Sequence, residues 1–202
     1  MSLKIEVFYS FQSPYSYLAL EPLYELEAHY DIELLWQPFS ARVAGQQLPA
    51  VPVLPEKFSY VLEDLKRSAT ELNVPFKIPE TWPASEFDPN RITRGAVVAN
   101  DMGVLKEYNY KVFNKCWGVG EDPNEENFLT ELAEELDIDL ADFLSRLSST
   151  DTRERVKGIY KRGRSLGVFD TPTMLIDKER LVGLDKVAYL EKRLTNMGLK
   201  LK

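Results

Sequence analysis

Residues 11–20 read FQSPYSYLAL, and residues 169–177 read FDTPTMLID. In the first stretch a serine directly precedes a proline, the usual order at a helix start, because serine caps free backbone N–H groups and proline tolerates the first turn. In the second stretch Pro172 stands just ahead of an apolar run that is typical of a strand. We therefore expect Ser13 to cap a helix and Pro172 to lead into a strand.

The flanks of the first stretch predict a β-α-β unit. Residues 5–9 alternate and are rich in aromatic and β-branched residues, and residues 13–30 have apolar positions at helical spacing. Residues 31–39, DIELLWQPF, follow as a second strand pattern. Ser13 should therefore lie at the positive end of a helix that follows the first strand.

The flanks of the second stretch predict a hairpin and a last helix. Residues 173–177 and 179–184 have strand patterns, and we expect the chain to turn between them at Lys178 and Glu179. Residues 185–196, DKVAYLEKRLTN, return to helical spacing. These elements would complete the mixed sheet that the first strands begin.

The sequence between these two ends is helical in pattern. Several segments of residues 43–161 repeat apolar side chains at about 3.6-residue spacing, after a proline-rich loop. We therefore predict an α/β fold with two domains. We expect residues 1–42 and 162–202 to form a mixed-sheet domain and residues 43–161 to form an inserted all-helical domain.

The composition argues against several classes of function. The 202 residues carry a formal net charge of −7, and 44% of them are hydrophobic. This apolar content supports a folded core, while the negative charge repels a phosphate backbone, so we expect no nucleic-acid partner. No apolar run approaches the roughly 20 residues that span a bilayer, and no signal-peptide core is evident, so we expect no membrane partner and a cytoplasmic location.

Thiol and imidazole chemistry are restricted by number. The chain has one cysteine, Cys116, and one histidine, His29. One cysteine forms neither an intramolecular disulfide nor a Cys-x-x-Cys pair, and one histidine argues against a Ser-His-Asp triad or a histidine metal site. We expect Cys116 to be buried, His29 to be structural or at the surface, and no metal to be bound. A reaction at sulfur therefore needs a thiol from outside the chain.

The two quoted stretches occupy the places that thioredoxin-like proteins use for redox chemistry. There a Cys-x-x-Cys begins the first helix and a cis-proline faces it, whereas here Ser13 and Ser16 replace the cysteines and Pro172 stands opposite. Together with VGLDKVAYLE at residues 182–191, this order resembles the 2-hydroxychromene-2-carboxylate isomerases and kappa-class glutathione transferases, a branch of the DsbA-like families.

A middle block strengthens the resemblance. The family has a Lys-x-x-Tyr-x-x-x-Asp-Leu helix, then a basic residue and a proline-containing segment; this chain has Lys57, Tyr60, Asp64, Leu65, Arg67 and NVPFKIP. The similarity runs over residues 5–195. It implies that the mixed-sheet domain of residues 1–42 and 162–202 is thioredoxin-like. It also implies glutathione as the cofactor, a small electrophilic or aromatic substrate, a part in aromatic degradation, and a homodimer.

The resemblance makes Ser13 the catalytic residue. A free thiol is only about a few per cent ionised at neutral pH, and a hydroxyl donor at a helix N-terminus stabilises the thiolate of bound glutathione. A cis Thr171–Pro172 bond leaves the backbone N–H and C=O of Thr171 free to pair with the cysteinyl part of glutathione. The alternatives are that Ser13 is only a helix cap and that Pro172 is only a strand-entry proline.

Further binding residues are implied at both ends of glutathione. Gly183, Leu184 and Asp185 precede the last helix, whose N–H groups suit the γ-glutamyl carboxylate while Asp185 pairs with its ammonium group. Lys57 corresponds to the family lysine that reaches the glycyl carboxylate or an acidic substrate. Asp185 as a simple helix cap and Lys57 as a solvated lysine are the alternatives.

Two further features bear on substrate choice. Family members usually have an aspartate three residues before the serine, where this chain has Ser10, a departure that concerns isomerase activity more than glutathione use. Aromatic side chains that could line a pocket or pack in a core are Tyr60, Trp82, Tyr108 and Trp117.

The leading expectation is a glutathione-dependent isomerase in which the thiolate adds reversibly to an unsaturated aromatic oxo-acid. The alternatives are a kappa-like glutathione transferase, which stops at the adduct, and a non-catalytic thioredoxin-like binding module. A disulfide oxidoreductase is disfavoured because the chain lacks the thiols.

Overall fold

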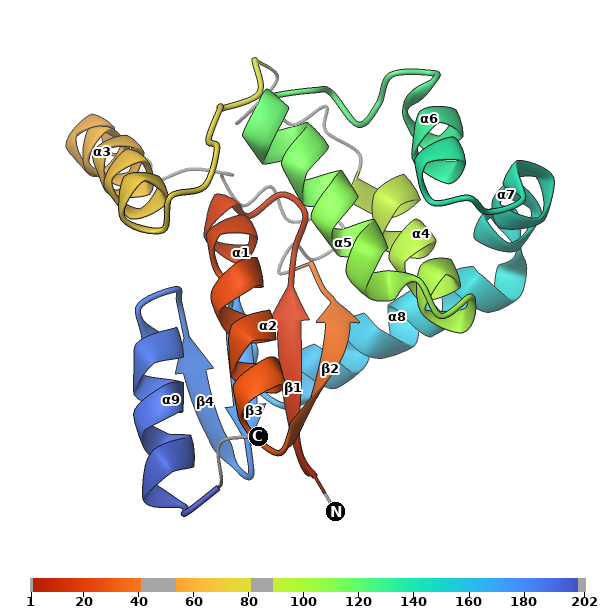
Figure 1. The fold of residues 1–202 in the computed structure, drawn as a ribbon. Coiled ribbons are helices and arrows are strands. Elements are labelled where there is room, and N and C mark those ends of the chain that lie inside the picture. The colour runs from red at the N-terminus through yellow and green to blue at the C-terminus, as the bar shows by residue number, and fades with distance from the viewer. Residues whose placement is uncertain (1, 41–53, 81–88, 200–202) are drawn as a thin grey trace. The chain divides into compact units, whose positions relative to one another are not determined.

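The computed structural model describes residues 2–40, 54–80 and 89–199 (Figure 1). Four strands in this part of the chain form one mixed sheet, in the order β2-β1-β3-β4. Helices make up most of the rest. The α/β fold class with a large helical insertion is confirmed. None of the helices within these ranges is long and apolar enough to cross a membrane.

The chain packs into two compact units. The sheet unit consists of Met1–Ala41 and Ile159–Lys202, and the helical unit consists of Arg42–Gly158. Whether the two units are independent domains, as expected for residues 1–42 with 162–202 and for residues 43–161, stays a prediction.

The sheet joins the two ends of the chain. Strand β1 (Leu3–Tyr9) pairs in parallel with β2 (Ile32–Pro38) and antiparallel with β3 (Thr173–Ile176). Strand β4 (Glu179–Val182) pairs antiparallel with β3 at the edge of the sheet. The predicted pairing of the first strand with the strand after Pro172 is thereby confirmed.

The hairpin turn lies one residue earlier than predicted. Ile176 pairs with Glu179, so the two turn residues are Asp177 and Lys178 rather than Lys178 and Glu179. Asp177 has a φ of 54°, in the left-handed region. Aspartate tolerates that region better than most residues because its short polar side chain can bond locally.

The first helical segment is interrupted once. Helix α1 (Pro14–Leu18) and helix α2 (Leu20–His29) meet at Ala19, whereas the sequence pattern predicted one helix over residues 13–30. Pro22 accounts for the break, because it has no N–H to donate to the carbonyl four residues earlier.

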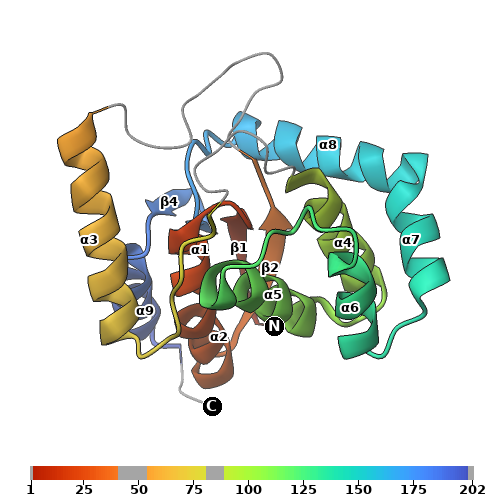
Figure 2. The ribbon, with the colours of Figure 1, turned by 90° about the horizontal axis from the view of Figure 1, so that it is seen from above.

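Helices cover both faces of the sheet (Figures 1 and 2). Helix α2 packs against β2, helix α9 (Lys186–Asn196) packs against β4, and the two helices contact each other. On the other face, the end of helix α8 (Thr150–Ser165) brings Tyr160 to a buried cluster that includes Phe8 and Phe39. This sandwich fixes β1 and the helix start that follows it.

The helical unit is built from helices that pack in pairs. Helix α4 contacts α5 and α7, and α6 contacts both α5 and α7. A π-helix, η1, continues α5 directly. Among the described residues its elements besides the start of α8 are α3 (Pro55–Glu71), α4 (Pro89–Asp101), α5 (Leu105–Phe113), η1 (Asn114–Val119), α6 (Phe128–Glu135) and α7 (Leu140–Ser148).

Candidate functional site

Ser13 caps helix α1, as the sequence predicted. Its Oγ accepts a hydrogen bond from the backbone N–H of Ser16 at 3.2 Å, and Pro14 occupies the first turn. The same hydroxyl donates to the backbone carbonyl of Thr171 at 2.9 Å, 158 residues further along the chain. One side chain therefore links the two stretches that the sequence singled out.

Ser10 organises the turn that leads into Ser13. Its Oγ accepts from the N–H of Gln12 at 3.2 Å, and its carbonyl accepts from the N–H of Ser13 at 3.0 Å. Its own N–H donates to the Oγ of the buried Ser16 at 3.3 Å. Sequence reasoning treated Ser10 only as a replaced aspartate and missed this role, although hydroxyl side chains commonly bond to the backbone two residues on.

The peptide bond between Thr171 and Pro172 is cis, as predicted. The two backbone polar groups of Thr171, however, are not free. The carbonyl accepts from the hydroxyl of Ser13, and the N–H donates to Oδ1 of Asp170 at 2.8 Å. Both partners lie in the sheet unit, so an extended peptide that pairs with Thr171 competes with side chains of the chain itself.

The segment before helix α9 is hydrogen-bonded to the cis-proline segment through the backbone. The N–H of Gly183 donates to the carbonyl of Pro172 at 2.9 Å. Gly183 has a φ of 104°, and a Cβ there would lie 2.7 Å from Oδ1 of Asp185. Asp185 makes no side-chain cap bond to α9 and pairs with the neighbouring Lys186 at 2.5 Å. Its carboxylate, 71% exposed, therefore lies beside Gly183 and is open to solvent.

The structure thus brings most of the predicted binding residues together. Ser13 and Thr171 share a hydrogen bond, and Pro172 follows Thr171 and bonds to Gly183. Leu184 and Asp185 continue directly from Gly183 into α9. Their binding of glutathione stays a prediction, as does that of Lys57, an exposed residue in the first turn of α3 in the helical unit.

The aromatic side chains divide between core and surface. Tyr108 is fully buried and donates its hydroxyl to the carbonyl of Ile92 at 2.8 Å, and burial raises the pKa of Tyr108. Trp117 is 1% exposed and stacks on Phe76. These two residues are core side chains, whereas Tyr60 is 57% exposed. Trp82 lies outside the described residues.

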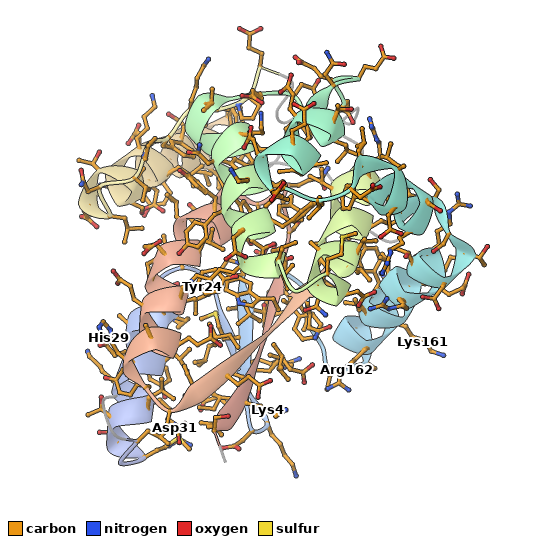
Figure 3. All side chains as sticks on the ribbon, turned by 45° about the vertical axis from the view of Figure 1, so that its right-hand side comes forward. Lys4, Tyr24, His29, Asp31, Lys161 and Arg162 are labelled. Atoms are coloured by element: carbon orange, nitrogen blue, oxygen red, sulfur yellow. The ribbon has the colours of Figure 1, made fainter. Side chains whose placement is uncertain are left out.

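The single cysteine and the single histidine of the chain have ordinary structural or surface positions. Cys116 is fully buried in η1 with no disulfide, as predicted, and burial followed by the charges of Glu121 and Asp122 raises the pKa of its thiol. His29 is an exposed residue at the end of α2 (Figure 3).

Comparison with known proteins defines the class. Residues 4–195 match the DSBA-like thioredoxin domain, so the chain belongs to that family. Within it, the chain is similar to the 2-hydroxychromene-2-carboxylate isomerase of Pseudomonas sp. (strain C18), at 30% identity over 191 residues, which are 93% of this chain and 88% of the relative. The isomerase of the same name from Sphingobium xenophagum is 27% identical over 199 residues, 95% of this chain and 97% of the relative.

Two more similarities fix the branch. Glutathione S-transferase kappa 1 of Rattus norvegicus is 23% identical over 180 residues, 84% of this chain and 79% of the relative. A solved structure of 2-hydroxychromene-2-carboxylate isomerase superposes with a TM-score of 0.85 at 26% identity and covers 96% of both chains. The resemblance noted from the sequence is confirmed, and the chain is an enzyme of the isomerase or transferase type.

Proposed function

We propose that this chain is a glutathione-dependent isomerase, in which Ser13 stabilises the thiolate of bound glutathione. The observation that carries the proposal is the 2.9 Å hydrogen bond between Ser13 Oγ and the carbonyl of Thr171. A peptide whose cysteinyl N–H pairs with the carbonyl of Thr171 would bring its own cysteine side chain toward that hydroxyl. In glutathione that side chain ends in the sulfur.

The setting of Cys116 argues that the reactive thiol comes from outside the chain. Cys116, its single cysteine, is buried in the helical unit, and its raised pKa keeps it protonated at neutral pH. A nucleophilic sulfur must be ionised and accessible. Glutathione supplies such a sulfur, and the hydroxyl of Ser13 is a donor of the kind that lowers the pKa of a thiol.

The proposed reaction is a reversible addition. The thiolate forms a C–S bond to the carbon–carbon double bond of an unsaturated aromatic oxo-acid, and the π electron pair moves to the conjugated carbonyl oxygen. The former double bond is now single and rotates. The enolate then returns its electron pair, the C–S bond breaks, and the double bond re-forms in the other geometry. Glutathione leaves unchanged, so no oxidant or reductant is needed.

Other groups of the site suit the ends of glutathione. The N-terminus of α9, an eleven-residue helix, suits the γ-glutamyl carboxylate, and the exposed carboxylate of Asp185 suits the γ-glutamyl ammonium group. Gly183 and Leu184 supply backbone there. Lys57 suits the glycyl carboxylate or an acidic substrate. We propose these roles together with that of Ser13, Thr171 and Pro172.

A kappa-like transferase is the second candidate, favoured by the similarity to the rat transferase. It would use the same residues but release a stable glutathione adduct. Product analysis separates the two functions, because an isomerase regenerates one glutathione per turnover and a transferase consumes one. For either function we propose a cytoplasmic homodimer. Light scattering of the purified protein tests the dimer, and fractionation of cells that produce the protein tests its location.

The thiolate role is tested by titrating enzyme-bound glutathione. Thiolate absorbance followed against pH should show the pKa of the bound thiol rising by about one unit or more in Ser13→Ala, at about 1.36 kcal/mol per unit. Ser149→Ala is the matched control, since Ser149 also caps a helix through its hydroxyl but lies in the helical unit. An identical titration in Ser13→Ala and wild type would show that Ser13 is only a cap.

A further inference from the structure

The hydroxyl of Ser13 has one proton, for which the carbonyl of Thr171 and the sulfur of a bound thiol would compete. It accepts from the N–H of Ser16 at 3.2 Å and donates to the carbonyl of Thr171 at 2.9 Å. A serine hydroxyl carries a single O–H donor. While that proton points at Thr171, it cannot also point at a sulfur.

The backbone carbonyl of Thr171 accepts this proton in a hydrogen bond. Thr171 is 8% exposed, and a carbonyl that loses its hydrogen-bond donor in such a site costs free energy. The N–H of an incoming cysteinyl residue is a donor that can replace Ser13 at this carbonyl. The carbonyl then stays satisfied, and the hydroxyl of Ser13 is released.

We propose that ligand binding exchanges these bonds, an inference that rests on the proposed function. The cysteinyl N–H of glutathione takes the carbonyl of Thr171, and the O–H of Ser13 turns about its Cβ–Oγ bond from that carbonyl to the sulfur. The bond from the N–H of Ser16 is kept, because it uses a lone pair and not the proton. Ser13 therefore becomes a thiolate donor only after a peptide with a free N–H has engaged Thr171.

The exchange predicts that removing the hydroxyl of Ser13 raises the affinity for some ligands, whereas removing a simple binding residue lowers it. Before the ligand arrives, Ser13 competes with it for the carbonyl of Thr171. A ligand that has the cysteinyl N–H but no sulfur loses this competition and gains nothing in return. Removing the hydroxyl should therefore tighten the binding of such a ligand.

The test uses two peptides and calorimetric titration of the full chain. The first peptide is γ-glutamyl-alanyl-glycine, which is glutathione with alanine in place of cysteine; the second carries an N-methyl group on that alanine. Ser13→Ala should bind the first peptide about two- to tenfold more tightly than wild type, the worth of about one net hydrogen bond. The N-methyl peptide should bind both proteins within about twofold. Ser13→Thr keeps the hydroxyl and should behave as wild type.

The outcomes separate this inference from the function on which it rests. Equal or weaker binding of γ-glutamyl-alanyl-glycine to Ser13→Ala overturns the exchange, because the carbonyl of Thr171 would then accept both donors at once. The same gain for the N-methyl peptide also overturns it, since that peptide has no N–H to place on Thr171. If wild type binds neither glutathione nor γ-glutamyl-alanyl-glycine at millimolar concentration, the proposed function itself falls.

Discussion

Ser13 and Ser149, one in each unit of the described structure, cap helix starts in the same way. The Oγ of Ser13 accepts from the N–H of Ser16 at 3.2 Å, and the Oγ of Ser149 accepts from the N–H of Thr152 at 3.1 Å. They differ in where the hydroxyl proton goes. Ser149 donates to Thr152 Oγ1 at 3.1 Å within its own turn, whereas Ser13 donates across the fold to Thr171.

The difference teaches which part of a cap is available for chemistry. Capping uses a lone pair of the oxygen, so it leaves the proton for another partner. At Ser149 that partner is local, and the hydroxyl serves only its own helix start. At Ser13 that partner is the backbone carbonyl of Thr171, in a segment far along the chain. A serine hydroxyl thus connects the segment after β1 to the segment before β3. It donates to a carbonyl at which a ligand N–H can take its place.

The largest expected difference between the two serines is in turnover. Ser13→Ala should lower turnover at neutral pH by about tenfold or more, because each unit by which the pKa of the bound thiol rises lowers the thiolate fraction about tenfold. The raised pKa of the bound thiol should shift the rising limb of the pH–rate profile to higher pH, so part of the loss is recovered in alkali. Ser149→Ala should leave both rate and profile as in wild type. Equal losses in the two variants would contradict the comparison.

The comparison extends to the two glycines that flank helix α9, Gly183 before its start and Gly198 after its end. Gly183→Ala and Gly198→Ala place alanine at φ values of 104° and 71°, and each should lower the free energy of unfolding by about 1–2 kcal/mol in urea titrations. The two sites differ in surroundings, because the added Cβ meets Asp185 at Gly183 and nothing within 4 Å at Gly198. Only Gly183→Ala should therefore displace the carboxylate of Asp185 and weaken glutathione binding. Unchanged affinity in that variant would remove Asp185 from the site.

In stability Ser13→Ala should cost somewhat more than Ser149→Ala. Each variant removes one N-cap, which costs about 0.5–2 kcal/mol. Ser13→Ala also leaves the carbonyl of Thr171 without its donor, which adds about 1–3 kcal/mol. Thermal or urea unfolding of the two variants checks this directly. Equal losses in the two variants would mean that the bond from Ser13 to Thr171 contributes nothing in the unliganded protein, and they would weaken the case for a donor that the ligand replaces.

The smallest expected effect concerns charge near the start of α8. Arg155 donates to Asp101 at 2.8 Å, and this hydrogen bond, followed by opposing burial and then the charge of Arg155, lowers the pKa of Asp101. A folded-state pKa below the unfolded one adds stability above the unfolded value of about 3.9 and loses it as the pH falls through the folded value. Arg155→Gln should therefore lower stability at pH 7 by less than about 1 kcal/mol, since the pair is partly exposed. The two proteins should converge in acid, and a difference that persists there would point to packing instead.

Local features of the fold were predictable from the sequence, and contacts between distant segments were not. The cap at Ser13 and the strand after Pro172 follow from neighbouring residues, and the break at Ala19 could have been read from Pro22. The hairpin turn was predicted one residue late because strand pattern alone does not fix register, which here depends on Asp177 adopting positive φ.

The site was predictable in its members and not in its bonds. Ser13 and Thr171 were singled out separately, but no spacing rule reports that a hydroxyl donates to a carbonyl 158 residues away. The bond from Thr171 N–H to Asp170 was missed for a different reason. An aspartate in a loop has many partners available, and only the folded backbone decides among them.

The antiparallel pairing of β1 with β3 sets an order of events during synthesis of the chain. Ribosomes add about 5–20 residues per second, so Thr171 follows Ser13, 158 residues earlier, by about 8 to 30 s. In that interval the residues of Arg42–Gly158 are added, while β1 still lacks its antiparallel partner β3. The whole helical segment is therefore synthesised before the residues that complete the sheet, and the hydroxyl of Ser13 meets its acceptor only when translation is nearly finished.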